Sequence, residues 1–203
     1  MVMIAETNEA DTRERVVVTA ERLFREIGYQ KTTVADIARL LRMSPANVYR
    51  FFESKRSIYE AVATRLMGEV ETAAVAIAFE TDPADRRLRR LLSEIHHMNA
   101  ERYTGDEKIH QMVAMAIEED WSVCNAHFER ITGIIAKVIE DGVKEGVFTV
   151  ADVPLAAMAT TTAMTRFFHP QVIAQCANKP GPTLDQMVDF VLAALTARPS
   201  AQA

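Results

Sequence analysis

Apolar residues recur every three or four positions along most of this sequence, which is the period of an α-helix with one buried face. The first such stretch runs from about residue 11 to residue 27, and Gly28 follows it in the position where helices commonly end. Short β-branched runs, such as residues 16–18, lie inside stretches that keep the helical period. The pattern therefore predicts an all-α protein.

Two shorter helices are expected next, because each is preceded by a side chain that can cap its first turn. Thr33 precedes a helix of about two turns, and Ser44 precedes another that has Pro45 in its first position. The link between them is only Arg42 and Met43. Packed on the helix that comes before, these elements have the size and layout of a helix-turn-helix DNA reader.

Longer helices are expected in the rest of the chain, where the apolar periodicity continues and Gly or Pro residues mark the breaks. We expect them near residues 55–79, 84–103, 107–119, 122–145, 152–168 and 183–197. We therefore assign residues 1–54 to a helix-turn-helix DNA-binding domain and residues 55–203 to a larger helical domain, for which the family resemblance described below implies ligand binding and dimerisation.

The net charge of the chain is −5, which by itself argues against a nucleic-acid partner, but the charge is unevenly distributed. Residues 13–60 hold ten basic and six acidic side chains, a local charge of +4 that leaves −9 for the rest. Such a basic head would be oriented toward phosphates. The sequence also has no long apolar run and no secretory signal, so we expect a cytoplasmic protein that does not engage a membrane.

The head resembles the tetracycline repressor (TetR) family of bacterial regulators over about 45 residues. The residues that carry the resemblance are Thr32-Thr33-Val34, Ile37-Ala38, Ser44, Val48-Tyr49-Arg50-Phe51-Phe52, Ser54-Lys55 and Ile58-Tyr59. It implies about nine helices in two domains and a homodimer formed through the last two helices. It also implies a repressor that binds a palindromic double-stranded DNA operator and is released by a small, largely apolar effector.

The resemblance further assigns roles to residues of the head. Thr33, Tyr49 and Lys55 would contact phosphates and so position the protein on DNA. Ala46, Asn47 and Arg50 would face base edges and so specify the sequence. The alternative for Tyr49 and Lys55 is an ordinary packing aromatic and a solvated lysine. The full predicted DNA-binding set is Thr33, Arg42, Ser44, Ala46, Asn47, Tyr49, Arg50 and Lys55.

The sequence departs from the family pattern at two positions of the head. Arg42 stands where a glycine is usual in the link, and Phe51 stands where a histidine is common. Arg42 must either adopt a positive φ, at a cost of about 1–2 kcal/mol, or the link must form another turn. In either conformation its guanidinium could reach a phosphate.

In the larger domain, methionine and aromatic residues recur at helical spacing, a pattern that is typical of ordinary core packing, whereas the TetR resemblance implies that such residues line an adaptable apolar ligand cavity. The candidate lining residues are Met67, Met98, Met112, Met115, Trp121 and Phe128. The last two helices are apolar nearly all round, which favours a four-helix dimer interface over burial within one protomer. The candidate interface residues are Leu155, Ala159, Met187, Phe190 and Val191.

Other classes of protein find less support in the sequence. A helical enzyme is the main alternative, but no GxSxG, HExxH or Gly-rich phosphate loop is present, and we expect no catalytic residues. Cys124 and His127 share a helix face, yet no second pair of ligands has matching spacing, so we expect neither a metal nor another cofactor. A regulator without ligand control stays open, and an enclosed pocket in the larger domain would argue against it.

Overall fold

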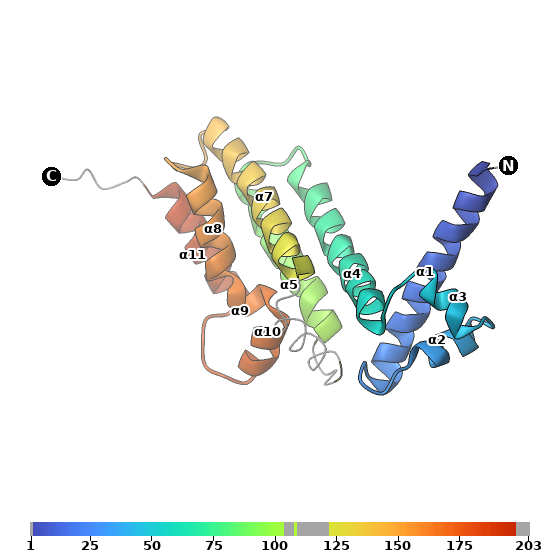
Figure 1. Cartoon of the computed structure of the whole chain (residues 1–203). Helices are drawn as coiled ribbons and strands as arrows, with labels where there is room; N and C mark the ends of the chain where they lie inside the picture. The colour runs from blue at the N-terminus through green and yellow to red at the C-terminus, as the bar shows by residue number, and fades with distance from the viewer. Residues whose placement is uncertain (1, 104–107, 109–121, 198–203) are drawn as a thin grey trace. The chain divides into compact units, whose positions relative to one another are not determined.

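The computed structural model of the protein describes residues 2–103, 108 and 122–197, and this part of the chain contains ten helices and no strand (Figure 1). The helices are α1 (Val2–Ile27), α2 (Val34–Leu40), α3 (Pro45–Tyr49), α4 (Lys55–Ala78), α5 (Ala84–Tyr103), α7 (Ser122–Lys144), α8 (Val153–Ala163), α9 (Thr165–Phe168), α10 (Pro170–Cys176) and α11 (Leu184–Thr196). The predicted all-α class is confirmed.

The chain forms two compact units, whose described parts are residues 2–67 with Lys108, and residues 68–103 with 122–197. The helix α4 contributes its first thirteen residues, up to Met67, to the first unit and the remainder to the second. The sequence places the domain boundary between residues 54 and 55, whereas the packing of the first unit continues through three turns of α4. We call the first unit the head and the second unit the body.

The head is a three-helix core onto which the start of α4 packs. Val16, Ala20 and Phe24 of α1 are fully buried, as are Ile37 of α2 and Val48 of α3. Such short helices are not stable alone, so this shared core holds α2 and α3 in place. Helix α2 lies against α1, and α3 lies against α2 (Figure 1).

The helices of the head begin and end at the capping residues that the sequence predicts. Gly28 has φ 88° after α1, and its N–H donates to the Phe24 carbonyl at 3.0 Å. The Thr33 hydroxyl accepts the Asp36 N–H at 3.1 Å, and the Asp36 carboxylate accepts the Thr33 N–H at 3.0 Å, which completes a capping box. Ser44 caps α3 through the Asn47 N–H at 3.2 Å. Both predicted N-caps are therefore confirmed.

The helical boundaries differ from the prediction in three places. First, α1 begins at Val2 rather than near residue 11, because no Gly or Pro interrupts the good helix formers that precede Asp11. Second, the stretch expected as one helix over 152–168 is divided at Met164 into α8 and α9. Third, the stretch read as a proline-marked link contains α10, because Pro170 stands at its first turn, where proline is tolerated.

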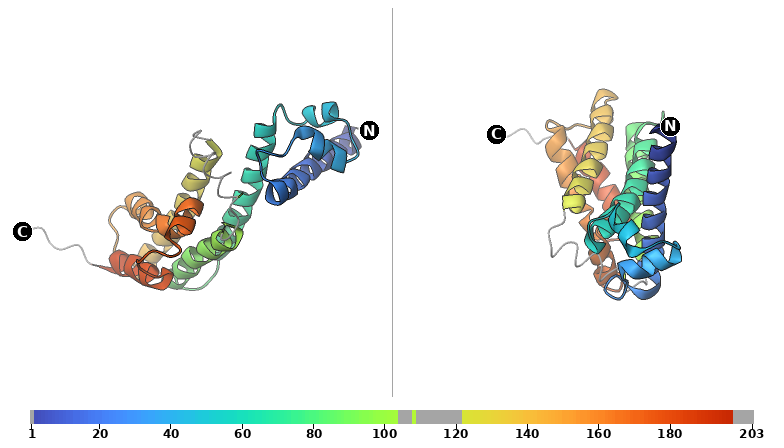
Figure 2. Two further views of the ribbon diagram at one scale, coloured as in Figure 1. Left: turned by 90° about the horizontal axis from the view of Figure 1, so that it is seen from below. Right: turned by 45° about the vertical axis from the view of Figure 1, so that its right-hand side comes forward.

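The body is a packed group of helices around an apolar core. Leu88, Leu91 and Leu92 of α5 are fully buried, and Ile135 and Ile139 of α7 face the same core. Figures 1 and 2 show α5, α7, α8 and α11 lying side by side in this unit. The short α9 packs on α5, where the Asn99 amide donates to the Phe168 carbonyl at 2.9 Å.

A buried arginine ties the turn between α4 and α5 to the end of α7. Arg87 is 4% exposed, and its guanidinium donates to the carbonyls of Ala78 and Asp82, each at 2.7 Å. It also pairs with Asp141 at 3.0 Å and Glu145 at 2.7 Å. The guanidinium therefore pairs with two carboxylates of the body, and these contacts offset the cost of burying it.

Candidate nucleic-acid interface

Helix α3 turns one side chain inward and leaves the rest of its surface accessible. Val48 is fully buried, whereas Ser44, Ala46 and Tyr49 are exposed, Tyr49 by 51%. The exposed groups are small or carry a hydroxyl, which suits an approach to the edges of base pairs. The structure therefore brings most of the predicted base-reading and backbone-contacting residues onto one exposed surface.

Asn47 and Arg50 are neighbours on this surface and are held by one another. An Arg50 N–H donates to the Asn47 side-chain oxygen at 3.4 Å, and the Asn47 amide lies 3.9 Å from the Met43 sulfur. The other Arg50 terminal nitrogen lies 3.8 Å from the Glu9 carboxylate in α1. The pair with Glu9 is largely solvated and therefore weak, so it leaves the Arg50 guanidinium available.

Arg42 adopts the strained conformation that the sequence left open. Its φ is 56°, in the left-handed region that favours glycine. The Arg42 N–H donates to the Arg39 carbonyl and the Met43 N–H donates to the Ala38 carbonyl, which together form a Schellman motif at the end of α2. The Arg42 side chain is exposed, so a positive charge lies beside α3.

Thr33 and Lys55 are less free than the sequence indicates. The Thr33 hydroxyl, besides accepting the Asp36 N–H, donates to the Asp36 carboxylate at 2.6 Å. Hydrogen bonds from Thr33 lower the pKa of that carboxyl, so Asp36 stays charged and keeps the cap closed. The Lys55 ammonium is directed into the head, where it donates to the carbonyls of Tyr29, Gln30 and Thr32. A contact between residues 23 to 26 positions apart leaves no local signal in the sequence.

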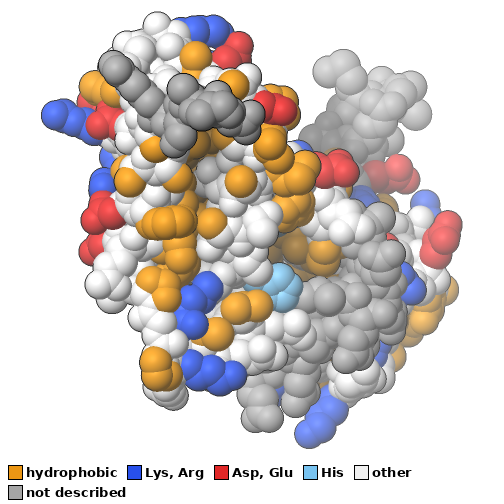
Figure 3. Space-filling view, turned by 90° about the vertical axis from the view of Figure 1, so that its left-hand side faces the viewer, with side chains coloured by type: hydrophobic (Ala, Val, Ile, Leu, Met, Phe, Trp, Pro, Cys, Tyr) orange, Lys and Arg blue, Asp and Glu red, His pale blue; other side chains and the backbone are white. Residues whose placement is uncertain are grey.

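The body carries an exposed apolar face on α8 and α11. Leu155 is 62% exposed and Phe190 is 65% exposed, and Ala159 lies on the same accessible side of α8. Figure 3, which looks onto the side that carries α8 and α11, shows hydrophobic side chains gathered in a band. A groove of about 330 Å³ runs between the two helices along this face. We call this surface the α8–α11 face.

Two of the predicted interface residues are placed differently from the others. Val191 is buried in the core of the protomer, and Met187 is half-buried against that core, so neither is accessible in the way that Phe190 is. Met158, which the sequence analysis did not single out, is 55% exposed on α8. A helix that is apolar nearly all round does not reveal from sequence which side turns inward.

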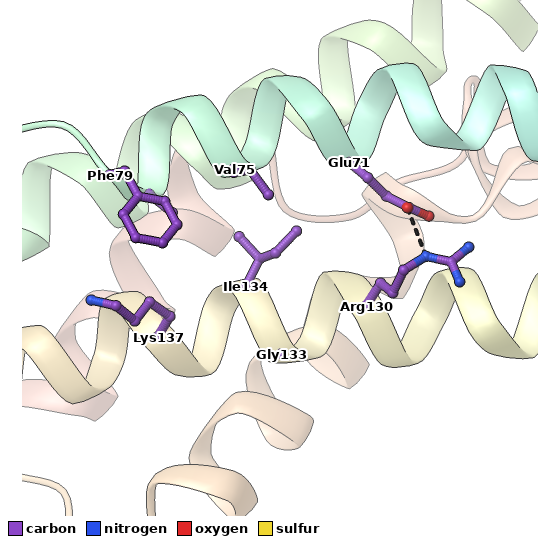
Figure 4. Close-up of a pocket in the computed structure, with 8 residues that line it drawn as sticks. Glu71, Val75, Phe79, Arg130, Gly133, Ile134 and Lys137 are labelled. Carbon is purple, nitrogen blue, oxygen red and sulfur yellow. Dashed lines mark hydrogen bonds and ion pairs between the residues drawn. The ribbon is translucent and has the colours of Figure 1, made fainter. Parts of the chain in front are cut away.

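A second groove, of about 450 Å³, lies between the later part of α4 and α7 within the body (Figure 4). Val75 of α4 and Phe79, which directly follows that helix, line it on one side, and Gly133 and Ile134 line it from α7. Figure 4 shows the Glu71–Arg130 ion pair bridging the two helices beside these apolar side chains. We call this the α4–α7 groove.

Polar groups close both ends of the α4–α7 groove. Glu71 accepts from Arg130 and contacts the His127 ring nitrogen, each at 2.6 Å. Although burial opposes it, the hydrogen bonds from these two residues hold the pKa of Glu71 below its ordinary value. At the other end the Lys137 ammonium lies 5.4 Å from the centre of the Phe79 ring and pairs with Asp141. The charges beside the groove are therefore paired, and the groove itself is apolar.

The predicted ligand-lining residues are not gathered in one described cavity. Met98 packs against the core of the body and Phe128 is 47% exposed on α7, while Met67 belongs to the head. Met112, Met115 and Trp121 lie outside the described residues. The sequence missed Val75 and Ile134, because apolar residues at helical spacing look the same whether they line a groove or a core.

Two further features bear on the class of protein. Cys124 and His127 do share a face of α7, but among the described residues no three potential ligands are grouped around a possible metal position. Burial raises the pKa of the Cys124 thiol, which makes it less reactive. Within the described ranges, no helix combines the length and the apolar character needed to cross a bilayer.

A capped pair of short helices on a basic head, attached to a larger helical body, defines the class of helix-turn-helix transcription regulators. Comparisons with known families agree with this class. Residues 16–62 match the family described as "Bacterial regulatory proteins, tetR family", and residues 84–188 match "Tetracyclin repressor-like, C-terminal domain". The chain belongs to the TetR family of transcriptional regulators.

Individual relatives support the assignment. The uncharacterised HTH-type transcriptional regulator YhgD of Bacillus subtilis (strain 168) is 25% identical over 153 residues, covering 72% of this chain and 77% of YhgD. IcaR of Staphylococcus aureus (strain Newman), a negative transcriptional regulator of the biofilm operon icaADBC, is 42% identical over 48 residues, covering 24% of this chain and 26% of IcaR. The crystal structure of Thermus thermophilus FadR, a TetR family transcriptional repressor in complex with lauroyl-CoA, has a TM-score of 0.62 at 18% identity, covering 94% of this chain and 98% of FadR. This last similarity concerns the fold alone.

Proposed function

We propose that this protein is a homodimeric repressor that binds a palindromic operator through α3 and is released by a small, largely apolar effector. The observation that carries the DNA-binding part is the surface of α3, where Tyr49 and Arg50 are exposed around a buried Val48. Repression is supported by IcaR, a negative transcriptional regulator that is 42% identical to this chain over 48 residues.

The roles within the head follow from accessibility. Ala46 and Asn47 would meet base edges, and Tyr49 would donate its hydroxyl to a phosphate. Arg42 and Arg50 present exposed guanidinium groups on either side of α3, where they would contact the phosphate backbone or a guanine. Thr33 and Ser44 would act through the helices that they cap, since their hydroxyls already serve the first turns.

The dimer part of the proposal is supported by the α8–α11 face. Monomeric proteins rarely leave large apolar side chains clustered at the surface, and Leu155, Met158 and Phe190 are each more than half exposed. A twofold dimer through this face would bury them and would present two heads to a palindromic site. Leu155, Ala159 and Phe190 would form the centre of the interface, with Met187 at its edge.

The DNA-binding part is tested by fluorescence anisotropy on DNA from upstream of the protein's own coding region, at two salt concentrations. The native protein should bind specifically and more weakly at the higher salt. Tyr49→Ala should weaken binding to every sequence, whereas Asn47→Ala should cost about 1–3 kcal/mol at one base position. Thr72→Ala, an exposed residue of the body, is the control. If the folded dimer binds no promoter fragment, the regulator hypothesis fails.

The effector part is supported by the α4–α7 groove, which is apolar and has its flanking charges paired. The lauroyl-CoA bound by Thermus thermophilus FadR suggests a hydrocarbon-rich effector as the first to try. An effector releases DNA only if it binds better to a state of the dimer that fits the operator poorly.

A glycine in this groove offers a sharp test. A Cβ at Gly133 would meet nothing within 4 Å, so we expect the longer side chain of Gly133→Leu to occupy the groove. Gly68 of α4 is equally open and lies outside the groove, which makes Gly68→Leu the matched control. We expect the neutral dye N-phenyl-1-naphthylamine to bind the native protein and Gly68→Leu but not Gly133→Leu. Equal binding by all three would place the effector elsewhere.

A further inference from the structure

The turn between α1 and α2 gathers several backbone carbonyls at one point of the head. Gly28 turns the chain with a positive φ, and the buried Thr32 closes the turn by donating from its hydroxyl to the Gly28 carbonyl at 2.8 Å. The carbonyls of Tyr29, Gln30 and Thr32 then all lie within hydrogen-bond distance of a single nitrogen. The Tyr29 carbonyl accepts the Thr32 N–H at 3.2 Å within the turn, and these carbonyls can also take further donors from outside it.

Lys55, the first residue of α4, supplies those donors. Its ammonium lies 3.0 Å from the Tyr29 carbonyl oxygen, 3.1 Å from that of Thr32 and 3.4 Å from that of Gln30. The same nitrogen lies 4.3 Å from the centre of the Tyr29 ring. An ammonium has three N–H bonds, and three carbonyls surround this one. Partial burial lowers the pKa of Lys55.

The aromatic neighbours make this contact part of the core. The Tyr29 ring packs edge-on against Phe24 of α1 and Tyr59 of α4, with ring centres 5.3 Å apart in both cases. The turn is thus attached to α4 twice, through the Lys55 ammonium and through the Tyr59 ring. Residue Thr33, which caps α2, follows directly after the turn. The position of the α2 N-terminus therefore depends on where Lys55 holds the turn.

We propose that Lys55 is a positioning residue, which fixes the turn between α1 and α2 and with it the helix-turn-helix surface, rather than a direct phosphate ligand. To meet a phosphate, its ammonium would have to give up its hydrogen bonds to three carbonyls, and this loss would offset the new contact. The proposal rests on the DNA-binding function proposed above. It differs from the role that the TetR resemblance assigns to this lysine.

The salt dependence of DNA binding separates the two roles. A lost phosphate contact makes the plot of log K against log salt concentration shallower by about 0.9, and its effect fades as salt rises. We expect Lys55→Met, which keeps an unbranched stem over Tyr29 but has no N–H, to bind DNA about tenfold more weakly at every salt concentration with an unchanged slope. Lys55→Arg should recover most of the affinity, since a guanidinium can still donate to several carbonyls.

Lys31→Met is the matched control, because Lys31 is an exposed lysine of the same turn. It removes an equal charge while leaving the three carbonyls covered, and any loss of affinity should fade at high salt. A shallower slope for Lys55→Met, with affinity restored at high salt, would overturn the proposal and show a phosphate contact. Unchanged affinity in Lys55→Met would overturn it as well.

Amide hydrogen exchange gives a readout that does not depend on DNA. In Lys55→Met, the amides of residues 29–33 should exchange about tenfold faster, whereas the rates in Lys31→Met should equal those of the native protein. If the native protein binds no DNA but this exchange pattern appears, the proposed function fails while the positioning of the turn stands. Unchanged exchange in Lys55→Met would overturn the positioning role itself.

Discussion

The head and the body differ in the kind of side chain that each leaves at its surface. On the head, α3 buries Val48 and exposes Tyr49, Arg50 and small residues, and the helix ends are closed by hydrogen-bonded caps. On the body, α8 and α11 expose Leu155 and Phe190, which have no polar group to offer a ligand. The first surface suits a charged, hydrated partner, and the second suits another apolar surface.

The two units therefore differ in what holds their helices in place and in the kind of surface that they offer to a partner. In the head the apolar core is small, so polar contacts such as the Thr33–Asp36 capping box help to fix short helices. In the body the apolar core is continuous, and the guanidinium of Arg87 is buried beside it although its partner Glu145 is exposed. Each of the following predictions alters one side of this comparison.

The largest effect is expected from placing a charge on the α8–α11 face. Phe190→Asp should abolish the dimer, because a carboxylate would be buried at the centre of an apolar interface. Specific operator affinity should then fall by at least about a hundredfold, since one head replaces two. Sedimentation velocity measures the first effect and anisotropy the second. Phe79→Asp is the control, because Phe79 is 70% exposed outside this face; dissociation by both variants, or by neither, would contradict the prediction.

The next effect concerns the buried cation of the body. Arg87→Met should lower the free energy of unfolding by about 3 kcal/mol, because Asp141, Glu145 and two backbone carbonyls lose their shared donor. Thermal denaturation followed by circular dichroism measures the loss. Arg90→Met removes a half-exposed arginine from the same helix and should cost less than about 1 kcal/mol. Equal losses in the two variants would mean that burial of Arg87 is not the cause.

In the head, the strain at Arg42 predicts a smaller change of the opposite sign. Arg42→Gly should raise the free energy of unfolding by about 0.5–1 kcal/mol, because glycine adopts φ 56° without strain. Arg42→Ala keeps the strained backbone conformation and removes the charge, so its free energy of unfolding should not rise. Both variants should bind DNA with a shallower salt dependence if the guanidinium contacts a phosphate. Stabilisation of the alanine variant would show that the backbone strain is not what changes.

The smallest effect is a pH dependence in the body. Burial lowers the pKa of His127 below its ordinary value, although the Glu71 carboxylate opposes the shift. The native state therefore binds fewer protons than the unfolded state, so this contribution is present above about pH 6.5 and is lost as the pH falls from there. In His127→Gln, the free energy of unfolding measured with urea should change less between about pH 7 and pH 5 than it does in the native protein. His97→Gln, at an exposed position, should keep the pH dependence of the unfolding free energy that the native protein has. An unchanged pH dependence in His127→Gln would exclude His127 as its source.

The sequence predicts those features that depend on neighbours along the chain. The caps at Thr33 and Ser44 and the end of α1 at Gly28 arise from contacts over four or five residues, where local chemistry decides the conformation. The positive φ of Arg42 is one of the two conformations that the sequence leaves open. The capture of three carbonyls by Lys55 joins distant segments, and no periodicity encodes it. For the same reason the burial of Val191 beside the exposed Phe190 appears only once α11 has packed.

The packing of α4 onto the head has a practical consequence for anyone who wishes to move this DNA reader to another protein. Ile58, Tyr59 and Val62 are buried, and Tyr59 contacts both Phe24 and Tyr29. A fragment cut after residue 54 would lose these side chains together with Lys55, and would expose the apolar surface that they cover. A chimaeric regulator should therefore include the chain through Met67, so that the transferred head keeps the first half of α4, which packs on it.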